Sequence, residues 1–130
     1  MKFRALLLLL FSLLISGSAF AQSKITFNVD MRSELEDSVF VPSRGDVLEI
    51  KGDFYPLNNP RGLVMVDDEP IDSVYSITVN FSSRYRNKSL TYNYFMTVNG
   101  QTRTEVLPRS LQLQGREIDL TPLYFNAFSW

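Results

Sequence analysis

The sequence predicts an all-β protein built as a two-sheet antiparallel β-sandwich of seven to eight short strands, preceded by a signal peptide. Apolar side chains recur at every second position in several segments, and turn-forming residues separate these segments at regular intervals. No segment after residue 21 shows a convincing helical period. With 130 residues, the chain has room for one leader and one domain.

Three segments show the clearest alternation of apolar and polar residues: Ile25–Met31, Tyr75–Phe81 and Leu90–Val98. This pattern is typical of a strand with one face buried and the other in water. Asn99-Gly100 directly follows the third segment, and this pair favours a type I′ hairpin because both central residues of that turn need positive φ. We therefore expect Gln101–Leu107 to return antiparallel to the third strand.

Shorter strands are expected between and after these three segments, and turn residues separate them. Glu34–Val39 is compatible with one helical turn, which is too short to change the fold class. Short strands with regular turn signals favour an immunoglobulin-like sandwich. The shorter candidate strands are Val47–Lys51, Leu63–Val66, Leu111–Leu113 and Leu120–Phe125, and the breakers are Pro42–Asp46, Pro56–Gly62, Asp67–Asp72 and Gly115.

The first 21 residues have the features of an export signal. Lys2 and Arg4 precede an apolar run, Ala5–Ile15, and Ala19 and Ala21 occupy the A-x-A positions before a cleavage site. A run of about 11 apolar residues is too short for the roughly 20 that a membrane-spanning helix needs. We therefore expect cleavage after Ala21, a secreted or periplasmic protein, and a single domain over residues 22–130.

Charge and composition exclude several function classes. After residue 21 the chain has 11 basic and 14 acidic residues, a mild excess of negative charge. Such a balance predicts no nucleic-acid partner and no anionic membrane surface, and no membrane span follows the leader. The chain has no cysteine and no histidine, which excludes disulfides and thiolate sites and removes the commonest general base. We expect a protein that is not an enzyme, without cofactor or metal.

Several features in a fixed order resemble the small starch-binding-like modules, of carbohydrate-binding-like fold, that accompany secreted bacterial hydrolases. The resemblance covers Lys24 to Phe125, nearly the whole chain after the leader. It is consistent with a bacterial source. The features are the opening strand Ile25–Met31, Phe40-Val41-Pro42 before Gly45-Asp46, the strand Val47–Lys51 with its Gly-x-Phe turn Gly52–Phe54, the strand Val74–Val79, Tyr92–Phe95 with Asn99-Gly100, and Glu105 with Arg109.

The resemblance implies binding of α-glucans, which family members achieve chiefly with exposed tryptophans. At the two corresponding places this chain has Tyr55-Pro56-Leu57 and Arg103-Thr104, with no tryptophan. If each ring platform removes about 100 Å² from water, each contributes roughly 2.5 kcal/mol. The loss of two ring platforms therefore removes about as much binding free energy as the approximately 4 kcal/mol that a millimolar complex has in total. The resemblance therefore predicts the fold more firmly than the affinity.

The candidate glycan-binding residues lie in one loop: Tyr55, Asn58, Asn59 and Arg61. An exposed Tyr55 ring offers a stacking face and a hydroxyl, and the amide and guanidinium groups offer hydrogen bonds to sugar hydroxyls. The alternatives are that Tyr55 caps the edge of the sandwich and that the asparagines serve turn geometry. Both alternatives stay open at the level of sequence.

Two clusters of charge have structural interpretations that we favour. Asp67, Asp68, Glu69 and Asp72 offer oxygen ligands for Ca²⁺, but their order does not match an EF-hand loop, and a solvated acidic turn is the preferred interpretation. Glu105 and Arg109 are expected to form a structural ion pair, because a guanidinium fork suits a carboxylate.

The aromatic residues near the end of the chain have more than one interpretation. Tyr92, Tyr94 and Phe95 lie in an alternating strand, where core packing is expected, especially for Tyr94. Phe125 is expected to fold back on the core. For Phe128 and Trp130 the alternatives are docking on a partner, a place in a last strand folded onto the core, and a frayed end, and the sequence does not decide among these.

The sequence therefore predicts a secreted, non-catalytic module that binds polysaccharide, a starch-like glycan, weakly through an exposed loop patch. The alternative is a protein-interaction or assembly module of the cell envelope, with an envelope protein as partner, that keeps the sandwich without sugar binding. Two exposed coplanar aromatic rings would favour the first hypothesis. An exposed apolar edge would favour the second.

Overall fold

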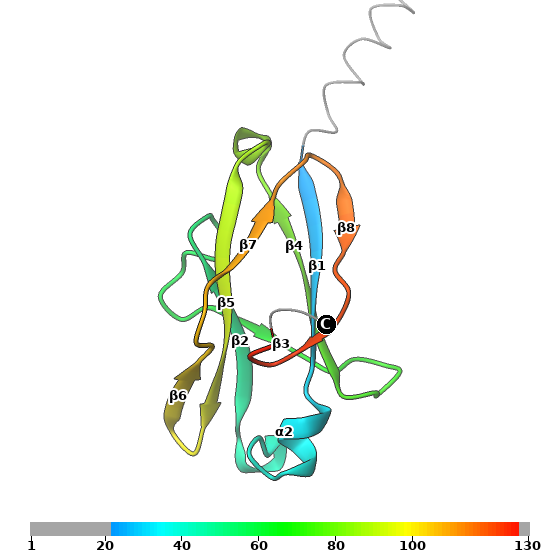
Figure 1. The fold of residues 1–130 in the computed structure, drawn as a ribbon, viewed down its shortest axis with the longest axis vertical. Helices are drawn as coiled ribbons and strands as arrows, with labels where there is room; N and C mark the ends of the chain where they lie inside the picture. The colour runs from blue at the N-terminus through cyan, green and yellow to red at the C-terminus, as the bar shows by residue number, and fades with distance from the viewer. Residues whose placement is uncertain (1–21, 128–130) are drawn as a thin grey trace, which may run out of the picture.

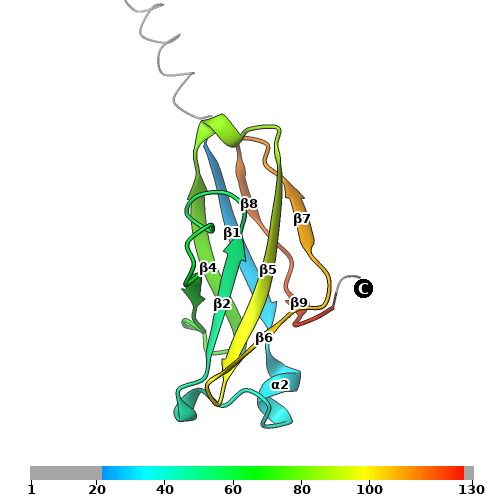
Figure 2. The same ribbon diagram turned by 90° about the vertical axis from the view of Figure 1, so that its left-hand side faces the viewer.

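The computed structural model describes residues 22–127 and shows two β-sheets packed face to face (Figures 1 and 2). The predicted all-β sandwich is confirmed, with nine strands in the described part of the chain where seven to eight were expected. The strands are β1 (Ser23–Asp30), β2 (Val47–Gly52), β3 (Leu63–Met65), β4 (Val74–Phe81), β5 (Ser89–Val98), β6 (Gln101–Thr104), β7 (Arg109–Gln112), β8 (Glu117–Asp119) and β9 (Leu123–Tyr124).

In residues 22–127, helical structure is limited to short turns. The helix α2 spans Arg32–Glu36, close to the predicted helical turn at Glu34–Val39, and two 3₁₀ turns are η2 (Pro42–Arg44) and η3 (Ser83–Tyr85). None of the helices described between residues 22 and 127 has the length and apolar character required to cross a membrane. The predicted leader, residues 1–21, lies outside the described residues, and so do Phe128 and Trp130.

The first sheet has the order β4-β1-β8, and β9 also pairs with β1. The β1–β4 pair is antiparallel, with Phe27 opposite Ile77. The pairs of β1 with β8 and β9 are parallel, which differs from the predicted all-antiparallel arrangement. The reason is the connection after β7, which crosses from one sheet to the other and brings the chain back in the direction of β1 (Figure 1).

The second sheet has the order β3-β2-β5-β6, with β7 also paired to β5, and all of its pairs are antiparallel. The predicted hairpin joins β5 to β6, and Asn99 and Gly100 have φ values of 53° and 78°. The return strand ends at Thr104, earlier than the expected Leu107. Two backbone hydrogen bonds between Val66 and Ser76 join the edge of this sheet to β4 of the first sheet.

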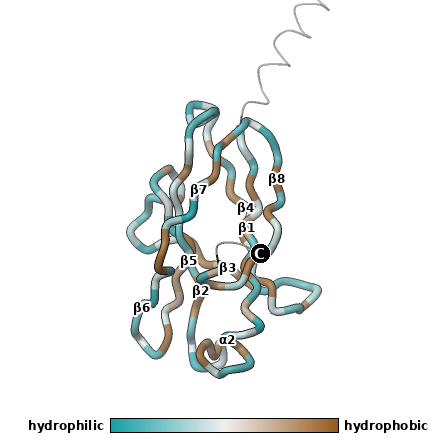
Figure 3. The backbone as a smooth tube through the Cα atoms, in the orientation of Figure 1, coloured by the Kyte–Doolittle hydropathy of each residue, from teal (hydrophilic) through white to brown (hydrophobic). Residues whose placement is uncertain are grey.

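The core lies between the two sheets and consists of the apolar residues that alternate along the strands (Figure 3). The Phe27 ring from β1 meets the Tyr92 ring from β5 edge to face, with centroids 5.0 Å apart. Phe125 packs against this core, and Tyr94 lies within it, as the sequence predicted. The largest fully buried side chains are Phe27, Phe40, Phe81, Ile25, Met31 and Leu48.

Candidate functional site

The predicted glycan-binding residues lie in the loop between β2 and β3, residues 53–62, and this loop is anchored by a buried side chain. Leu57 is fully buried in the core. Its carbonyl oxygen accepts a hydrogen bond from the Gly52 amide at 2.9 Å, and its own amide donates to the Phe54 carbonyl at 2.7 Å. The middle of the loop is therefore held against the end of β2.

The four predicted residues are all exposed on this loop. Tyr55 has 69% of its surface in water, the largest exposed fraction of any aromatic side chain in residues 22–127. Asn58, Asn59 and Arg61 are exposed as well. The Asn59 side-chain oxygen accepts a hydrogen bond from the Arg61 amide at 3.2 Å, so this oxygen supports the turn, as the alternative interpretation expected. The ring of Tyr55 and the side chains of Asn58 and Arg61 carry the chemistry of the patch.

A shallow groove of about 330 Å³ lies on the outer face of the second sheet, next to this loop. Asp53, which begins the loop, lines the groove. Gly62 ends the loop and has a φ of +67°. It lies so close to the groove residue Phe95 that a Cβ atom at position 62 would be 2.8 Å from the Phe95 ring. Both ends of the loop that carries the patch therefore border the groove. The groove is lined by Lys51, Gly52, Asp53, Thr91, Tyr92, Asn93, Phe95, Thr102 and Thr104.

The groove combines polar walls with an aromatic floor. Phe95 is buried although it lies on the outer face of β5, and the Lys51 ammonium sits 4.6 Å from the centre of its ring. The Asp53 carboxylate accepts a hydrogen bond from the Thr91 backbone amide at 3.0 Å, and the Asn93 side-chain Nδ2 donates to the Leu107 carbonyl at 2.6 Å. Hydroxyl, amide and ammonium groups facing a cavity at the small end of the usual ligand-site range suit a ligand with many hydroxyls.

The groove was not predicted from the sequence. The alternating pattern of Leu90–Val98 predicts a strand but no groove, and it favours core packing for Phe95. The available signal was Phe95 itself, an aromatic residue at a position where the alternation places polar residues. Such an exception indicates that something covers the outer face of the sheet at that point.

Aromatic residues beside the loop are already in contact with one another. The Phe54 and Tyr85 rings are stacked, with centroids 4.4 Å apart and planes 7° from parallel. Both side chains are half-buried. This stack joins the loop to η3 and leaves Tyr55 as the ring of the patch that faces water.

Glu105 and Arg109 form the predicted structural ion pair. The guanidinium donates two hydrogen bonds to the carboxylate, at 2.8 and 2.5 Å, and both side chains are buried. Burial opposes the charge of Arg109, but the Glu105 hydrogen bonds prevail and raise the pKa of Arg109. The carboxylate also accepts hydrogen bonds from the amides of Tyr94 and Asn126, and Arg109 donates to the Ala127 carbonyl. The pair thus fastens the last described residues to β5.

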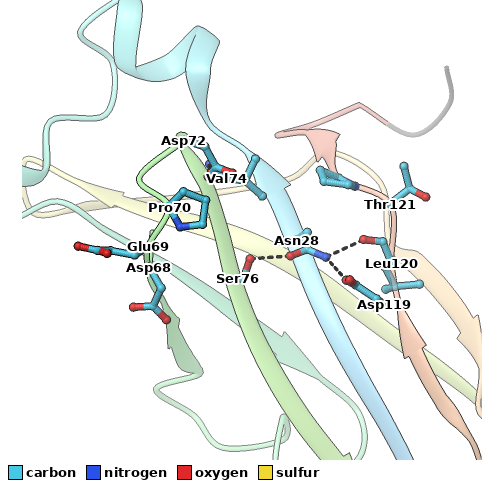
Figure 4. Close-up of a pocket in the computed structure, with 11 residues that line it drawn as sticks. Asn28, Asp68, Glu69, Pro70, Asp72, Val74, Ser76, Asp119, Leu120 and Thr121 are labelled. Atoms are coloured by element: carbon cyan, nitrogen blue, oxygen red, sulfur yellow. Dashed lines mark hydrogen bonds between the residues drawn. The ribbon is translucent and has the colours of Figure 1, made fainter.

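The acidic turn lines a second, larger groove of about 480 Å³ on the outer face of the first sheet (Figure 4). Asp67 accepts hydrogen bonds from the amides of Asp72 and Ser73, so its carboxylate stabilises the turn. At the floor, the Asn28 side-chain Nδ2 donates a hydrogen bond to the Asp119 carboxylate at 2.6 Å, and its Oδ1 accepts one from the Ser76 hydroxyl. No group of three or more carboxylates within residues 22–127 is arranged to hold a metal ion.

Glu34 on α2 is a titratable group that the sequence did not single out. One of its carboxylate oxygens is buried without a hydrogen-bond partner. Burial, with smaller contributions from Asp30 and Asp37, raises the pKa of Glu34. A carboxyl group whose pKa is raised by folding favours the protonated form in the folded state, so its ionisation destabilises the fold.

We expect Glu34→Gln to stabilise the protein at neutral pH by up to about 1 kcal/mol, a small gain because water partly screens this site. Because the folded pKa lies above the unfolded value of about 4.3, the ionisation penalty grows as the pH rises through the folded pKa and is complete above it. Urea unfolding of both proteins at several pH values measures this. The difference should vanish near pH 4, and an equal difference at all pH values would contradict the interpretation.

The fold and the surface together define a class: a small β-sandwich module whose candidate site is a loop patch, with a shallow groove beside that loop on the outer face of one sheet. No family model matches the sequence, and no curated protein matches it. Among solved structures, the chain is similar to the glucoamylase of Hormoconis resinae, with 13% identity and a TM-score of 0.55. The similarity covers 84% of this chain but only 18% of the glucoamylase chain, and it shows the fold alone.

Proposed function

We propose that this protein is a secreted, non-catalytic module that binds polysaccharide weakly through the loop patch of Tyr55, Asn58, Asn59 and Arg61 and the adjoining groove. The observation that carries the proposal is the position of Tyr55. Its ring is 69% exposed on a loop that Leu57 anchors to the core, beside a groove lined by hydroxyl and amide groups. An exposed ring with polar neighbours is the usual way for a protein surface to hold a sugar ring.

Two further facts support a glycan as the ligand. The chain shares its fold with part of a glucoamylase, an enzyme whose name refers to glucan substrates, and we propose that the shared part is a glucan-binding module. The groove has a volume of about 330 Å³, which suits one or two sugar units rather than a long enclosed chain. With one exposed ring in the patch, we expect a weak complex. The leader predicted at residues 1–21 supports export.

We expect Tyr55→Ala to lower the affinity for a starch-like glucan by about tenfold or more, because one ring platform contributes roughly 1.5–2.5 kcal/mol. Affinity electrophoresis or calorimetry of residues 22–130 with soluble amylopectin measures the effect. Tyr124→Ala is the matched control, since this tyrosine is also exposed but lies on β9 of the other sheet. Equal losses in the two variants, or binding that Tyr55→Ala leaves unchanged, would contradict the proposed site.

A second candidate is a protein-interaction or assembly module of the cell envelope. Val106 and Leu107 are exposed apolar neighbours, Val106 to 77%, and the Val106 amide donates to the Asn126 side chain at 2.8 Å. This apolar surface therefore adjoins the last described residues of the chain. The absence of binding to amylopectin and to other neutral glucans would favour this second function.

A further inference from the structure

One end of the sandwich carries five basic side chains from three segments that are far apart in the sequence. We call this surface the basic end, and it consists of Lys24, Arg84, Arg86, Lys88 and Arg116. Lys24 lies at the start of β1, the next three lie in and after η3, and Arg116 lies between β7 and β8. All five are exposed.

Backbone hydrogen bonds hold the three segments together. The Lys24 amide donates to the Arg116 carbonyl at 3.1 Å, and the Leu113 amide donates to the Lys88 carbonyl at 2.9 Å. The connection that contains η3, the start of β1 and the β7–β8 connection lie at the same end of the molecule in both views (Figures 1 and 2). The basic end is therefore a fixed surface of the fold and does not depend on a single mobile loop.

The charges of the basic end are mostly not neutralised by carboxylates. Arg84, Arg86, Lys88 and Arg116 form no ion pair with any residue of the described range 22–127, and Lys24 has a long contact of 3.7 Å with the exposed Glu117. The arginines elsewhere that have partners, such as Arg32 and Arg44, pair with their neighbouring aspartates at 2.7 and 2.6 Å. No acidic residue occurs between Ser73 and Thr104. A cluster of unpaired positive charge creates a local field that attracts anions.

The overall charge of the chain conceals this cluster. Residues 30–46, at the opposite end with α2, hold five acidic and two basic side chains, and the turn at residues 67–72 adds four carboxylates. The mild acidic excess of the chain is therefore the sum of two surfaces of opposite sign. The expectation of no nucleic-acid partner and no anionic membrane surface followed from the net charge, which does not describe the local charge of the basic end.

An aromatic ring supports the cations of the basic end. Arg84 lies 4.9 Å from the centre of the Tyr85 ring and donates a hydrogen bond to the Tyr85 hydroxyl at 2.7 Å. Tyr85 in turn stacks on Phe54. Arg84 is thus held in one orientation, which lowers the entropic cost of binding an anion with its guanidinium fork.

We propose that the basic end binds an anionic polysaccharide, a chain of sugars that carry carboxylate or sulfate groups, at a site separate from the loop patch. The guanidinium and ammonium groups would bind the carboxylates, with one anionic group available on each acidic sugar. A saccharide is favoured over a membrane because none of the large exposed apolar side chains belongs to the segments of the basic end. It is favoured over nucleic acid because the stacked Phe54 and Tyr85 rings leave no free ring here for a base.

The test measures binding of residues 22–130 to sodium polygalacturonate by affinity electrophoresis and calorimetry at low salt. We expect Arg86→Glu with Lys88→Glu to lower the affinity about tenfold or more, and salt at about 0.5 M to abolish binding, because counterion release and screening govern such contacts. Arg103→Glu is the control for the single variant Arg86→Glu. Arg103 is an exposed arginine on β6 that forms no ion pair within residues 22–127. Its substitution should change the affinity less than about twofold, because β6 lies toward the other end of the molecule (Figure 1), away from a polysaccharide bound at the basic end.

Several outcomes would overturn this proposal. No binding to polygalacturonate at low salt, or equal losses in Arg86→Glu and Arg103→Glu, would show that the basic end is not a site. Tighter binding of single-stranded DNA or of phosphatidylglycerol vesicles than of polygalacturonate would replace the saccharide by another polyanion. Tyr55→Ala should leave polygalacturonate binding unchanged, and the basic-end variants should leave amylopectin binding unchanged, so the two proposals fail independently. An unchanged thermal midpoint confirms that each variant is folded.

Discussion

Replacing Glu105 with alanine is expected to lower the free energy of unfolding by about 3–5 kcal/mol, the cost of leaving one member of a buried ion pair without its partner. The Arg109 guanidinium would remain buried against the Tyr94 ring, whose centre is 5.0 Å away. The amides of Tyr94 and Asn126 would also lose their acceptor. Because a domain of this size has a free energy of unfolding of only about 5–15 kcal/mol, this loss would be a large fraction of the total.

Urea unfolding monitored by far-UV circular dichroism measures this loss, and Glu117→Ala is the control. Glu117 forms an ion pair with Lys24 in which both side chains are largely exposed, so its removal should cost less than about 1 kcal/mol. A cost for Glu105→Ala as small as that for Glu117→Ala would mean that the buried pair contributes little. Proteolysis at the end of the chain should also increase in Glu105→Ala, since the pair fastens Asn126 and Ala127.

Leu57→Ala is expected to destabilise the protein by about 2–5 kcal/mol and also to weaken glucan binding. Leu57 is fully buried, and its backbone exchanges hydrogen bonds with Gly52 and Phe54. Loss of its side chain leaves a cavity and removes the anchor that positions Tyr55. Denaturant unfolding gives the first effect, and the same affinity measurement as for Tyr55→Ala gives the second.

Leu107→Ala is the matched control for this variant, because it removes the same atoms from an exposed leucine. Its stability should change by less than about 0.5 kcal/mol. If Leu57→Ala lost stability but kept full affinity in conditions where it is folded, the orientation of Tyr55 would not depend on the anchor. The loop patch would then have to be replaced by a site within the groove.

The strands that alternate could be predicted from sequence, because period-two patterning and sheet burial have the same physical origin. The predicted segments beginning at Ile25, Tyr75 and Leu90 correspond to β1, β4 and β5, and the Asn99-Gly100 turn joins β5 to β6. Val47–Lys51 and Leu63–Val66 correspond to β2 and β3 within one residue at each end.

The parallel pairing of β1 with β8 and β9 could not be predicted. β8 is three residues long, and two of these are acidic, so no alternation marks it as a strand. β8 forms because Glu117 and Ile118 pair with residues of β1, which lie far away in the sequence. Pairing of this kind is a property of the assembled sheet and leaves no local pattern.

The candidate site could be predicted in part. Turn residues such as Pro56 and Asn59 indicated a loop, and the exposure of Tyr55 follows from its place in that loop. The groove could not be predicted, since Asp53, Asn93 and Thr104 come from three separate elements that only the folded sheet brings together. The basic end has the same origin, because Lys24 and Arg116 meet only across a completed sheet.

The central place of β1 in its sheet has a consequence for the order of folding. Asn28 in β1 bonds to Leu120, 92 positions later, so this sheet cannot close until nearly all the described chain is available. Contacts at such separation slow folding, because a long loop must be closed before any energy is gained. A nascent copy can therefore complete this sheet only when its synthesis is almost finished.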